Sequence, residues 1–290
     1  MLVGTPSHEE RVVEERWVPH GTNRLFCREY PGRDPAIVLM HGFPDDLHLY
    51  DRLIPHLSEG HRVVAFDFLG WGSSDKPFPY PYTADRQVTD ISAVVEGLQL
   101  EQVVLVVHDS SGPPGIDWAL DHPDRVAGLV LLNTYYGLMR GMRPPEAILL
   151  FSNPITGPVA RRIPVESRLY RALYHWQVGR FMNDSEVRED VVAQLWPSFV
   201  QAFPAFARLN ADLIRAIRDR VGRFPELRTF EPPVAVVFGA DDPYLNPRVA
   251  ERFHELFAKS SLDLIDGANH YVQVDKPAQV AAIIENLVST

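Results

Sequence analysis

The sequence predicts an α/β protein in which a mostly parallel sheet is flanked by helices and a helical segment is inserted after the sixth principal strand. Three observations lead to this prediction. Short runs of β-branched residues alternate with amphipathic stretches over the first part of the chain, as in βαβ units. The strand signal then stops between residues 135 and 228. It returns in the last part of the chain, where strands and helices alternate again.

Individual elements follow from these patterns. In the first part, apolar runs predict strands at 36–40, 62–68, 103–107 and 126–132, and helical spacing predicts helices at 85–98 and 116–120. In the last part, we expect strands at 234–238 and 262–265 and helices at 247–257 and 277–288. The segment between contains several prolines and then three helical stretches, at 167–181, 186–199 and 207–221.

These elements divide the chain into a first core part (1–134), a helical insertion (135–228) and a second core part (229–290). The insertion also differs in composition, because residues 136–228 contain 14 arginines, nine acidic residues and no lysine. The whole chain, in contrast, carries a formal net charge of −10. We expect the arginines to form salt bridges on helix surfaces and not to bind anions.

Composition excludes several classes of protein. With 290 residues of which 46% are hydrophobic, the chain can bury a large core, and disorder is not expected. The negative charge disfavours nucleic acid as a partner, since phosphate binding needs a basic surface. The single cysteine, Cys27, cannot form an internal disulfide and is expected to be a small buried hydrophobic residue on an early strand. No Cys/His spacing resembles a zinc site, so no metal is expected.

The first twenty residues carry many charges, including Glu9, Arg11 and Glu15, and lack the apolar stretch of a signal peptide or membrane span. We therefore expect a cytoplasmic protein with no membrane partner. A small-molecule substrate is the expected partner, and the protein is expected to be a monomer or a homodimer.

The most informative motif, VHDSSG (107–112), directly follows a predicted strand. A nucleophile elbow needs small residues two positions on either side of the nucleophile, because the strand turns sharply into a helix there. Centring the elbow on Asp109 puts Val107 and Ser111 at these positions, whereas centring it on Ser110 puts His108 in a crowded position. If this segment stood alone, an ordinary helix N-cap would be the favoured interpretation of Asp109. Together with the two later loops, the fit to the elbow makes Asp109 the predicted nucleophile.

Two later loops supply an acid and a base. The segment AVVFGADDP (235–243) places a carboxylate after one strand, and LIDGANHYVQVDKP (264–277) places His270 after the next. Nucleophile, acid and histidine in this chain order form the arrangement of an α/β-hydrolase triad. Of the two adjacent acids we choose Asp242, and we expect Asp241 to be solvated.

The loop HGFP (41–44) resembles the His-Gly-x-Pro oxyanion loop of epoxide hydrolases and dehalogenases of the α/β-hydrolase fold. The similarity extends to FDFLGWGSSDKP (66–77) and HPDRVAGLVLLNT (122–134) and covers almost the whole chain outside the insertion. The resemblance implies that the insertion forms a cap over the active site. It also implies an oxyanion hole from the backbone N–H groups of Phe43 and Ser110, and it includes His41 among the residues that bind substrate. The family spacing Gly-x-x-Asp, here from Gly239, supports the choice of Asp242.

An aspartate nucleophile restricts the chemistry. Its carboxylate attacks a carbon that bears a halide or an epoxide oxygen, and the resulting ester is hydrolysed by water. His270, oriented by Asp242, is expected to activate that water. The resemblance implies no metal and no organic cofactor.

The chain departs from each subfamily in the groups that stabilise the leaving group. Haloalkane dehalogenases carry a Trp after the nucleophile and many use an Asn in the oxyanion loop, where this chain has Ser110 and Phe43. Fluoroacetate dehalogenases resemble it in the cap pair His175-Trp176 but carry an arginine after the nucleophile, which is absent here. Asn133 stands where some dehalogenases place their acid, and this again supports Asp242.

Epoxide hydrolases protonate the opening ring with two cap tyrosines, for which Tyr170, Tyr174 and His175 are candidates. Tyr170, Tyr174 and Trp176 could instead form an apolar helix face that packs on the core. Four functions remain open. The leading one is hydrolysis through an aspartyl ester, of an epoxide or a haloalkane. The others are a serine esterase that uses Ser110, a small-molecule binding protein, and a cofactor-free lyase or cyclase.

Overall fold

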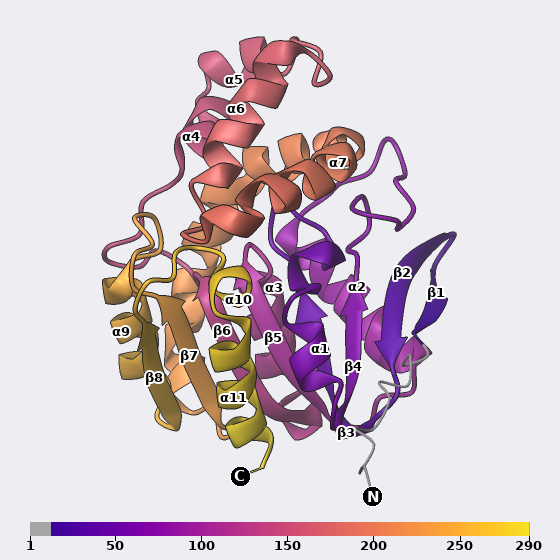
Figure 1. Cartoon of the computed structure of the whole chain (residues 1–290), viewed down its shortest axis with the longest axis vertical. Coiled ribbons are helices and arrows are strands. Elements are labelled where there is room, and N and C mark those ends of the chain that lie inside the picture. The colour runs from indigo at the N-terminus through magenta and orange to yellow at the C-terminus, as the bar shows by residue number, and fades with distance from the viewer. Residues whose placement is uncertain (1–12, 290) are drawn as a thin grey trace, which may run out of the picture.

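The computed structural model describes residues 13–289, which form an eight-stranded sheet with helices on both faces (Figure 1). Residues 1–12, on which the expectation of no leader segment partly rests, lie outside the described residues. The strand order is β1-β2-β4-β3-β5-β6-β7-β8. The strands are β1 (Glu14–His20), β2 (Asn23–Tyr30), β3 (Arg33–Met40), β4 (His61–Phe66), β5 (Val103–Asp109), β6 (Val126–Thr134), β7 (Val234–Gly239) and β8 (Ser260–Ile265).

The sheet is parallel from β4 to β8, as predicted, and antiparallel at one edge, where β1 pairs with β2 and β2 with β4. The central strands are buried almost along their whole length, because helices cover both faces. Strand β1 was not predicted, since most of its side chains are exposed and it lacks an apolar run. Cys27 is buried in β2, as expected.

Helices α1 (Ile54–Leu57) and α11 (Pro277–Val288) pack together on one side of the sheet, and α2 (Ala84–Gly97) and α3 (Gly112–Asp121) pack together on the other (Figure 1). The prolines of α3 lie in its first turn, as expected. A Cβ atom at Gly115 would lie 2.4 Å from Cγ1 of Val107. This glycine therefore lets α3 approach β5 closely. The remaining core elements are η1 (Leu47–Tyr50), η2 (Pro123–Arg125), α9 (Pro247–Leu256) and α10 (Val272–Asp275).

The segment between β6 and β7 is helical, as predicted, and those of its helices that Figure 1 labels lie above the sheet at the carboxyl ends of the strands. It consists of α4 (Glu146–Ser152), α5 (Thr156–Ala160), α6 (Arg168–Gly179), α7 (Ser185–Arg220), η3 (Val221–Arg223) and α8 (Phe224–Arg228). We refer to α4–α7 as the cap. Among residues 13–289, no helix is long and apolar enough to cross a membrane.

The expectation of separate helices at 186–199 and 207–221 is wrong, because α7 runs continuously through Pro197 and Pro204. Each proline removes one intrahelical hydrogen bond. The buried side chains nevertheless keep an unbroken spacing of three or four residues past both prolines, and their packing holds the helix together. They include Val192, Leu195, Trp196, Phe199, Ala202, Ala205, Phe206 and Leu209.

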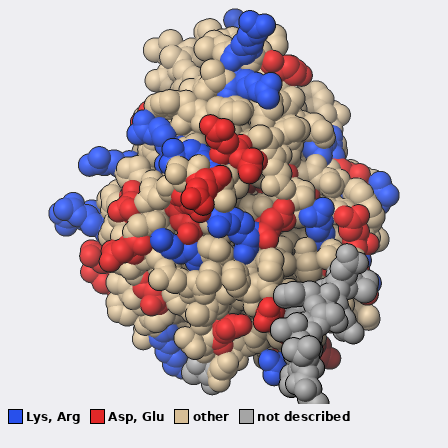
Figure 2. Space-filling view, in the orientation of Figure 1, with Lys and Arg blue, Asp and Glu red and all other residues tan. Residues whose placement is uncertain are grey.

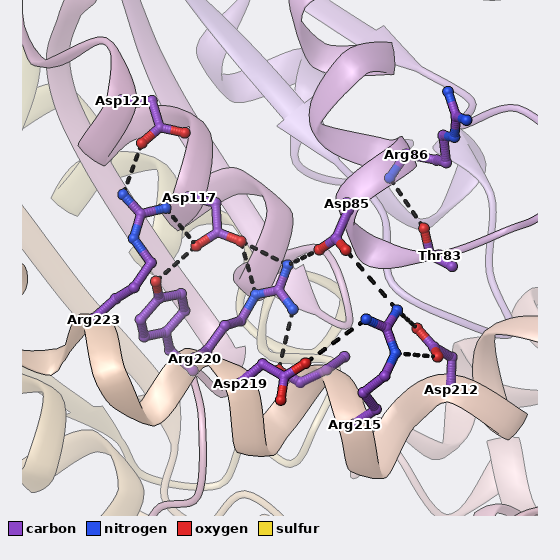
Figure 3. A network of polar contacts seen from close by, with 12 residues as sticks. Thr83, Asp85, Arg86, Asp117, Asp121, Asp212, Arg215, Asp219, Arg220 and Arg223 are labelled. Carbon is purple, nitrogen blue, oxygen red and sulfur yellow. Dashed lines mark hydrogen bonds and ion pairs between the residues drawn. The ribbon is translucent and has the colours of Figure 1, made fainter.

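A buried ion-pair network joins the end of α7 to the core (Figure 3). Nη2 of Arg220 lies 2.6 Å from Oδ2 of Asp117 in α3 and 3.0 Å from Oδ1 of Asp85 in α2. Arg223 adds a second contact to Asp117, at 3.0 Å. Within residues 13–289, four of the 14 arginines of the insertion form ion pairs with acidic side chains, namely Arg215, Arg218, Arg220 and Arg223. The expectation of salt bridges holds for these four. On the face in Figure 2, basic and acidic side chains are interspersed.

We predict that Asp117→Ala lowers the free energy of unfolding by about 3 kcal/mol, because it leaves the buried Arg220 guanidinium without its buried partner. Urea unfolding measures the change. Arg218→Ala is the matched control, since it removes an exposed ion pair with Asp219 on the same helix and should change little. Equal losses in the two variants would contradict the assignment of the network as a clamp.

Candidate active site

A sharp turn between β5 and α3 places Asp109 at the carboxyl end of a central strand of the sheet. Asp109 has a φ of 47°, in the left-handed region, as a strand-to-helix elbow requires. Ser111 fills the inside of the turn, where its Oγ accepts a hydrogen bond from the backbone N–H of His108 at 2.8 Å and lies 2.8 Å from the carbonyl oxygen of Met40. A larger side chain at Ser111 would not fit in this space.

The loop after β3 lies directly against Asp109. The backbone N–H of Phe43 donates to Oδ2 of Asp109 at 3.3 Å, and the N–H of Ser110 also acts on this carboxylate. A Cβ atom at Gly42 would lie 2.6 Å from Cβ of Asp109, so only glycine allows this approach. Burial raises the pKa of Asp109, and the charge of His270 and the two N–H groups oppose this shift only in part.

Asp242 and His270 meet at the same edge of the sheet, after β7 and β8. Nδ1 of His270 lies 2.8 Å from Oδ2 of Asp242. The Nδ2 of Asn133 donates to that same oxygen at 2.9 Å, and the N–H groups of Tyr244 and Leu245 donate to Oδ1. Burial alone would raise the pKa of Asp242, but the charge of His270 and these hydrogen bonds outweigh it and lower the pKa. Asp242 is therefore a carboxylate that is hydrogen-bonded to the histidine.

The other ring nitrogen of His270, Nε2, faces Asp109 and lies 3.9 Å from its Oδ1. This distance exceeds a hydrogen bond, so Oδ1 of Asp109 is not bonded to the imidazole. Burial would lower the pKa of His270, but the charge and hydrogen bond of Asp242, and then the charge of Asp109, raise it above the ordinary value.

Two buried groups that were given no role in the sequence analysis also lie beside His270. His108 is fully buried, and its Nε2 lies 3.1 Å from the carbonyl oxygen of His270. Asp45 accepts a hydrogen bond from the Tyr271 hydroxyl, and burial raises the pKa of this carboxyl to about 8. In the sequence, only the closeness of His108 to Asp109 and of Asp45 to Phe43 could have indicated that these two residues lie at the site.

A cavity between cap and core opens onto Asp109 and His270. It contains about 870 Å³ of space, part of it open to solvent. Most of its walls are apolar and come from both layers, with Phe151, Leu173, Phe199, Phe206 and Ile217 from the cap and Phe43, Tyr135 and Leu245 from the core. Tyr170 and Tyr174 line it as well. Among residues 13–289, no group of three or more His, Cys, Asp or Glu side chains is arranged to hold a metal ion.

His41 is not among the residues that line this cavity, so its position does not support the expectation that it binds substrate. Its Nδ1 donates to the carbonyl oxygen of Gly42 at 2.7 Å, and its Nε2 accepts the backbone N–H of Phe68 at 3.2 Å. Burial lowers the pKa of His41 to about 4, so the ring is neutral. His41 therefore shapes the loop that carries Phe43.

His175 and Trp176 also lie outside the cavity lining. Successive residues of a helix point in directions about 100° apart. The lining residues Leu173, Tyr174 and Gln177 therefore share one face of α6, and His175 and Trp176 lie on the other side. Trp176 is 45% exposed and stacks under the guanidinium of Arg180. The expectation that this pair binds substrate is thus not supported by its position.

Comparison with known proteins adds the family context. A family profile described as the alpha/beta hydrolase fold matches residues 35–277. A haloalkane dehalogenase of Mycobacterium marinum is 30% identical over 97% of this chain and 93% of its own length. Two solved structures have the same fold: the epoxide hydrolase CorEH, with a TM-score of 0.79 at 20% identity and coverage of 96% and 99%, and an esterase of Thermogutta terrifontis, with a TM-score of 0.77 at 21% identity and coverage of 95% and 98%.

We predict that the His270 imidazole titrates above its ordinary pKa of about 6.5 and that Asp242→Asn moves this pKa below that value. The substitution removes the negative charge that favours the protonated ring, and burial then dominates. An NMR titration of the His270 ring protons measures both values. Asp241→Asn, which neutralises the exposed neighbouring acid, is the control and should leave the titration near that of the unmodified protein. If it shifts His270 as much as Asp242→Asn does, the pairing of His270 with Asp242 is wrong.

Proposed function

Because the chain belongs to the α/β-hydrolase fold family, we propose that it is a hydrolase in which Asp109 forms a covalent ester with a small apolar epoxide. One observation carries this proposal. A carboxylate, and not a hydroxyl, occupies the centre of the elbow and faces both the histidine and the backbone N–H donors. Ser110, the alternative nucleophile, does not line the cavity.

In the first step, the free Oδ1 of Asp109 attacks a ring carbon of the epoxide, and the carbon–oxygen bond of the ring breaks. The ring oxygen then takes up a proton and becomes a hydroxyl group. Oδ2 of Asp109 remains with the N–H of Phe43, 3.3 Å away. The contacts of the two carboxylate oxygens thus favour Oδ1 as the attacking atom.

In the second step, Nε2 of His270 takes a proton from water, and the water oxygen attacks Cγ of the Asp109 ester. Negative charge develops on Oδ2, where the N–H groups of Phe43 and Ser110 stabilise it. The bond between Cγ and Oδ1 then breaks, the leaving oxygen takes the proton from Nε2 of His270, and the diol leaves with the former Oδ1. Asp109 releases the second proton of the water and returns to a carboxylate. Asp242 stabilises the imidazolium that exists between these events.

The cavity supports an epoxide more than a halide as the reacting group. Haloalkane dehalogenases hold the halide with a tryptophan next to the nucleophile. Among the described residues, no tryptophan lines this cavity. Four tyrosines do line it, and a phenol hydroxyl can protonate a leaving oxygen. The apolar walls favour a substrate with hydrocarbon substituents.

We predict that Asp109→Ala abolishes epoxide turnover, with a loss of several orders of magnitude, whereas Ser110→Ala keeps a substantial rate. Only the elbow residue both attacks the substrate and contacts the oxyanion donors. Steady-state hydrolysis of a panel of apolar epoxides, such as styrene oxide and 1,2-epoxyoctane, measures the difference. A lethal Ser110→Ala combined with an active Asp109→Ala would favour the serine esterase.

We also predict that His270→Gln accumulates the Asp109 ester, because attack by the carboxylate needs no base but attack by water does. Intact-protein mass spectrometry should then show the mass of the added epoxide, localised by peptide mapping to Asp109. In oxygen-18 water, a single turnover of the unmodified protein should leave the label on Asp109 and not on the diol. Label that appears mainly in the first-turnover diol would exclude the ester.

A further inference from the structure

The tyrosines that line the cavity differ in whether their hydroxyl groups are free to donate to a bound substrate. The Tyr170 hydroxyl donates to the carbonyl oxygen of Ala160, and the Tyr244 hydroxyl donates to Glu146 at 2.8 Å. The Tyr174 hydroxyl has no hydrogen-bond partner, but it is fully enclosed by protein atoms. The cap tyrosines expected to protonate an opening ring are therefore either engaged or not accessible.

Tyr135 is the fourth tyrosine of the cavity, and its hydroxyl makes no hydrogen bond within residues 13–289. Unlike the Tyr174 hydroxyl, it is not among the fully enclosed polar atoms that lack a partner. Its side chain is 7% exposed, so the ring is held by its surroundings while the hydroxyl remains accessible. Tyr135 therefore lines a mostly apolar cavity and carries an accessible hydroxyl that has no partner among residues 13–289.

The sheet places Tyr135 beside Asp109. Thr134, the last residue of β6, pairs with Asp109 in the register of β5 and β6, and its Oγ1 donates to the carbonyl oxygen of Asp109 at 2.5 Å. Tyr135 follows directly, and both its side chain and Asp109 line the same cavity. Because it extends from the core sheet and not from the cap, its position relative to Asp109 is fixed by backbone pairing.

We propose that Tyr135 is the catalytic residue that protonates the ring oxygen when Asp109 opens the epoxide. This inference rests on the proposed function. The phenol proton moves to the ring oxygen as the carbon–oxygen bond breaks, leaving a phenolate on Tyr135. Ester hydrolysis then releases the diol, the Asp109 carboxylate and one proton, and that proton restores the phenol. The cycle therefore consumes one epoxide and one water and needs no further reactant.

The electrostatics of the site favour this transfer. Burial and the nearby Asp109 carboxylate raise the pKa of Tyr135, so its hydroxyl is protonated before the reaction. Formation of the ester removes the negative charge of Asp109. Of the two causes that raise the pKa of Tyr135, only burial then remains. Arg220, whose charge lowers the pKa of Tyr135, remains in place. The phenol thus becomes more acidic as the leaving oxygen gains charge.

The test measures the rate of ester formation in the His270→Gln background, where the second step does not interfere. Intact-protein mass spectrometry follows adduct formation with styrene oxide and 1,2-epoxyoctane in His270→Gln alone and combined with Tyr135→Phe or Tyr136→Phe. Tyr136 is the matched control, because its hydroxyl donates to Asp117 and the residue does not line the cavity. Substrate dependence of the rate and the thermal unfolding midpoint are recorded for each variant.

We expect Tyr135→Phe to lower the maximal rate of ester formation at least about 100-fold, as loss of a general acid does, with little change in the half-saturating epoxide concentration or in the unfolding midpoint. Tyr136→Phe should keep the parent rate. Equal rates in the parent and the Tyr135→Phe variant would overturn the role of Tyr135 and leave the aspartyl-ester function intact. If His270→Gln itself forms no adduct with any epoxide that the unmodified protein hydrolyses, the proposed function fails and the role of Tyr135 fails with it.

Discussion

The candidate active site depends on one backbone turn, in which Asp109 adopts a left-handed φ of 47° between β5 and α3. Aspartate is one of the few non-glycine residues that tolerate this region, although at some cost in strain. Two glycines make the space for it. A Cβ atom at Gly42 would meet Cβ of Asp109, and one at Gly112 would lie 1.9 Å from Oγ1 of Thr134. The turn therefore presents the carboxylate to the N–H of Phe43 and to the cavity.

Three aspartates surround His270, the buried Asp45 and Asp242 and the partly exposed Asp109, and their environments give them different charges. The charge of His270, together with hydrogen bonds to both carboxylate oxygens, keeps the pKa of Asp242 low despite burial. Asp45 has a single phenol donor, and burial raises its pKa to about 8, so it is mostly neutral at neutral pH. Asp109 lies between these cases, with its pKa raised mainly by burial. The His270 imidazole thus faces two carboxylates, those of Asp242 and Asp109. Because Asp45 is mostly neutral, the interior does not contain a third carboxylate charge without a partner.

The cap is attached at two places to the elements that carry the site residues, once between α6 and α7 and once at the end of α7. Between α6 and α7, the carbonyl oxygen of Phe181 accepts the N–H of Tyr271, the residue after His270, at 2.8 Å. Asp275 of α10 accepts the N–H groups of Asn183 and Asp184 in the same stretch. At the far end of α7, Arg220 pairs with α3, the helix that begins at the elbow. These contacts therefore couple the position of the cap to the geometry of the site.

The sequence alone determined the features that depend on neighbours along the chain. These were the alternation of strands and helices, the elbow at Asp109, and the order of the acid and the histidine after later strands, because turn geometry and hydrophobic spacing are local properties. Asn133 ended a predicted strand, but only the fold brings its amide to Asp242, more than a hundred residues away along the chain.

Tertiary structure also decided that α7 continues through its prolines and that Trp176 points outward. It decided as well which of the tyrosines has a hydroxyl that is free to act on a substrate. Tyr135, Tyr170 and Tyr174 carry the same side chain, but whether a hydroxyl is free depends on which distant backbone or side-chain groups lie beside it. Those neighbours exist only when the chain is folded, because long-range packing, and not local pattern, brings them together.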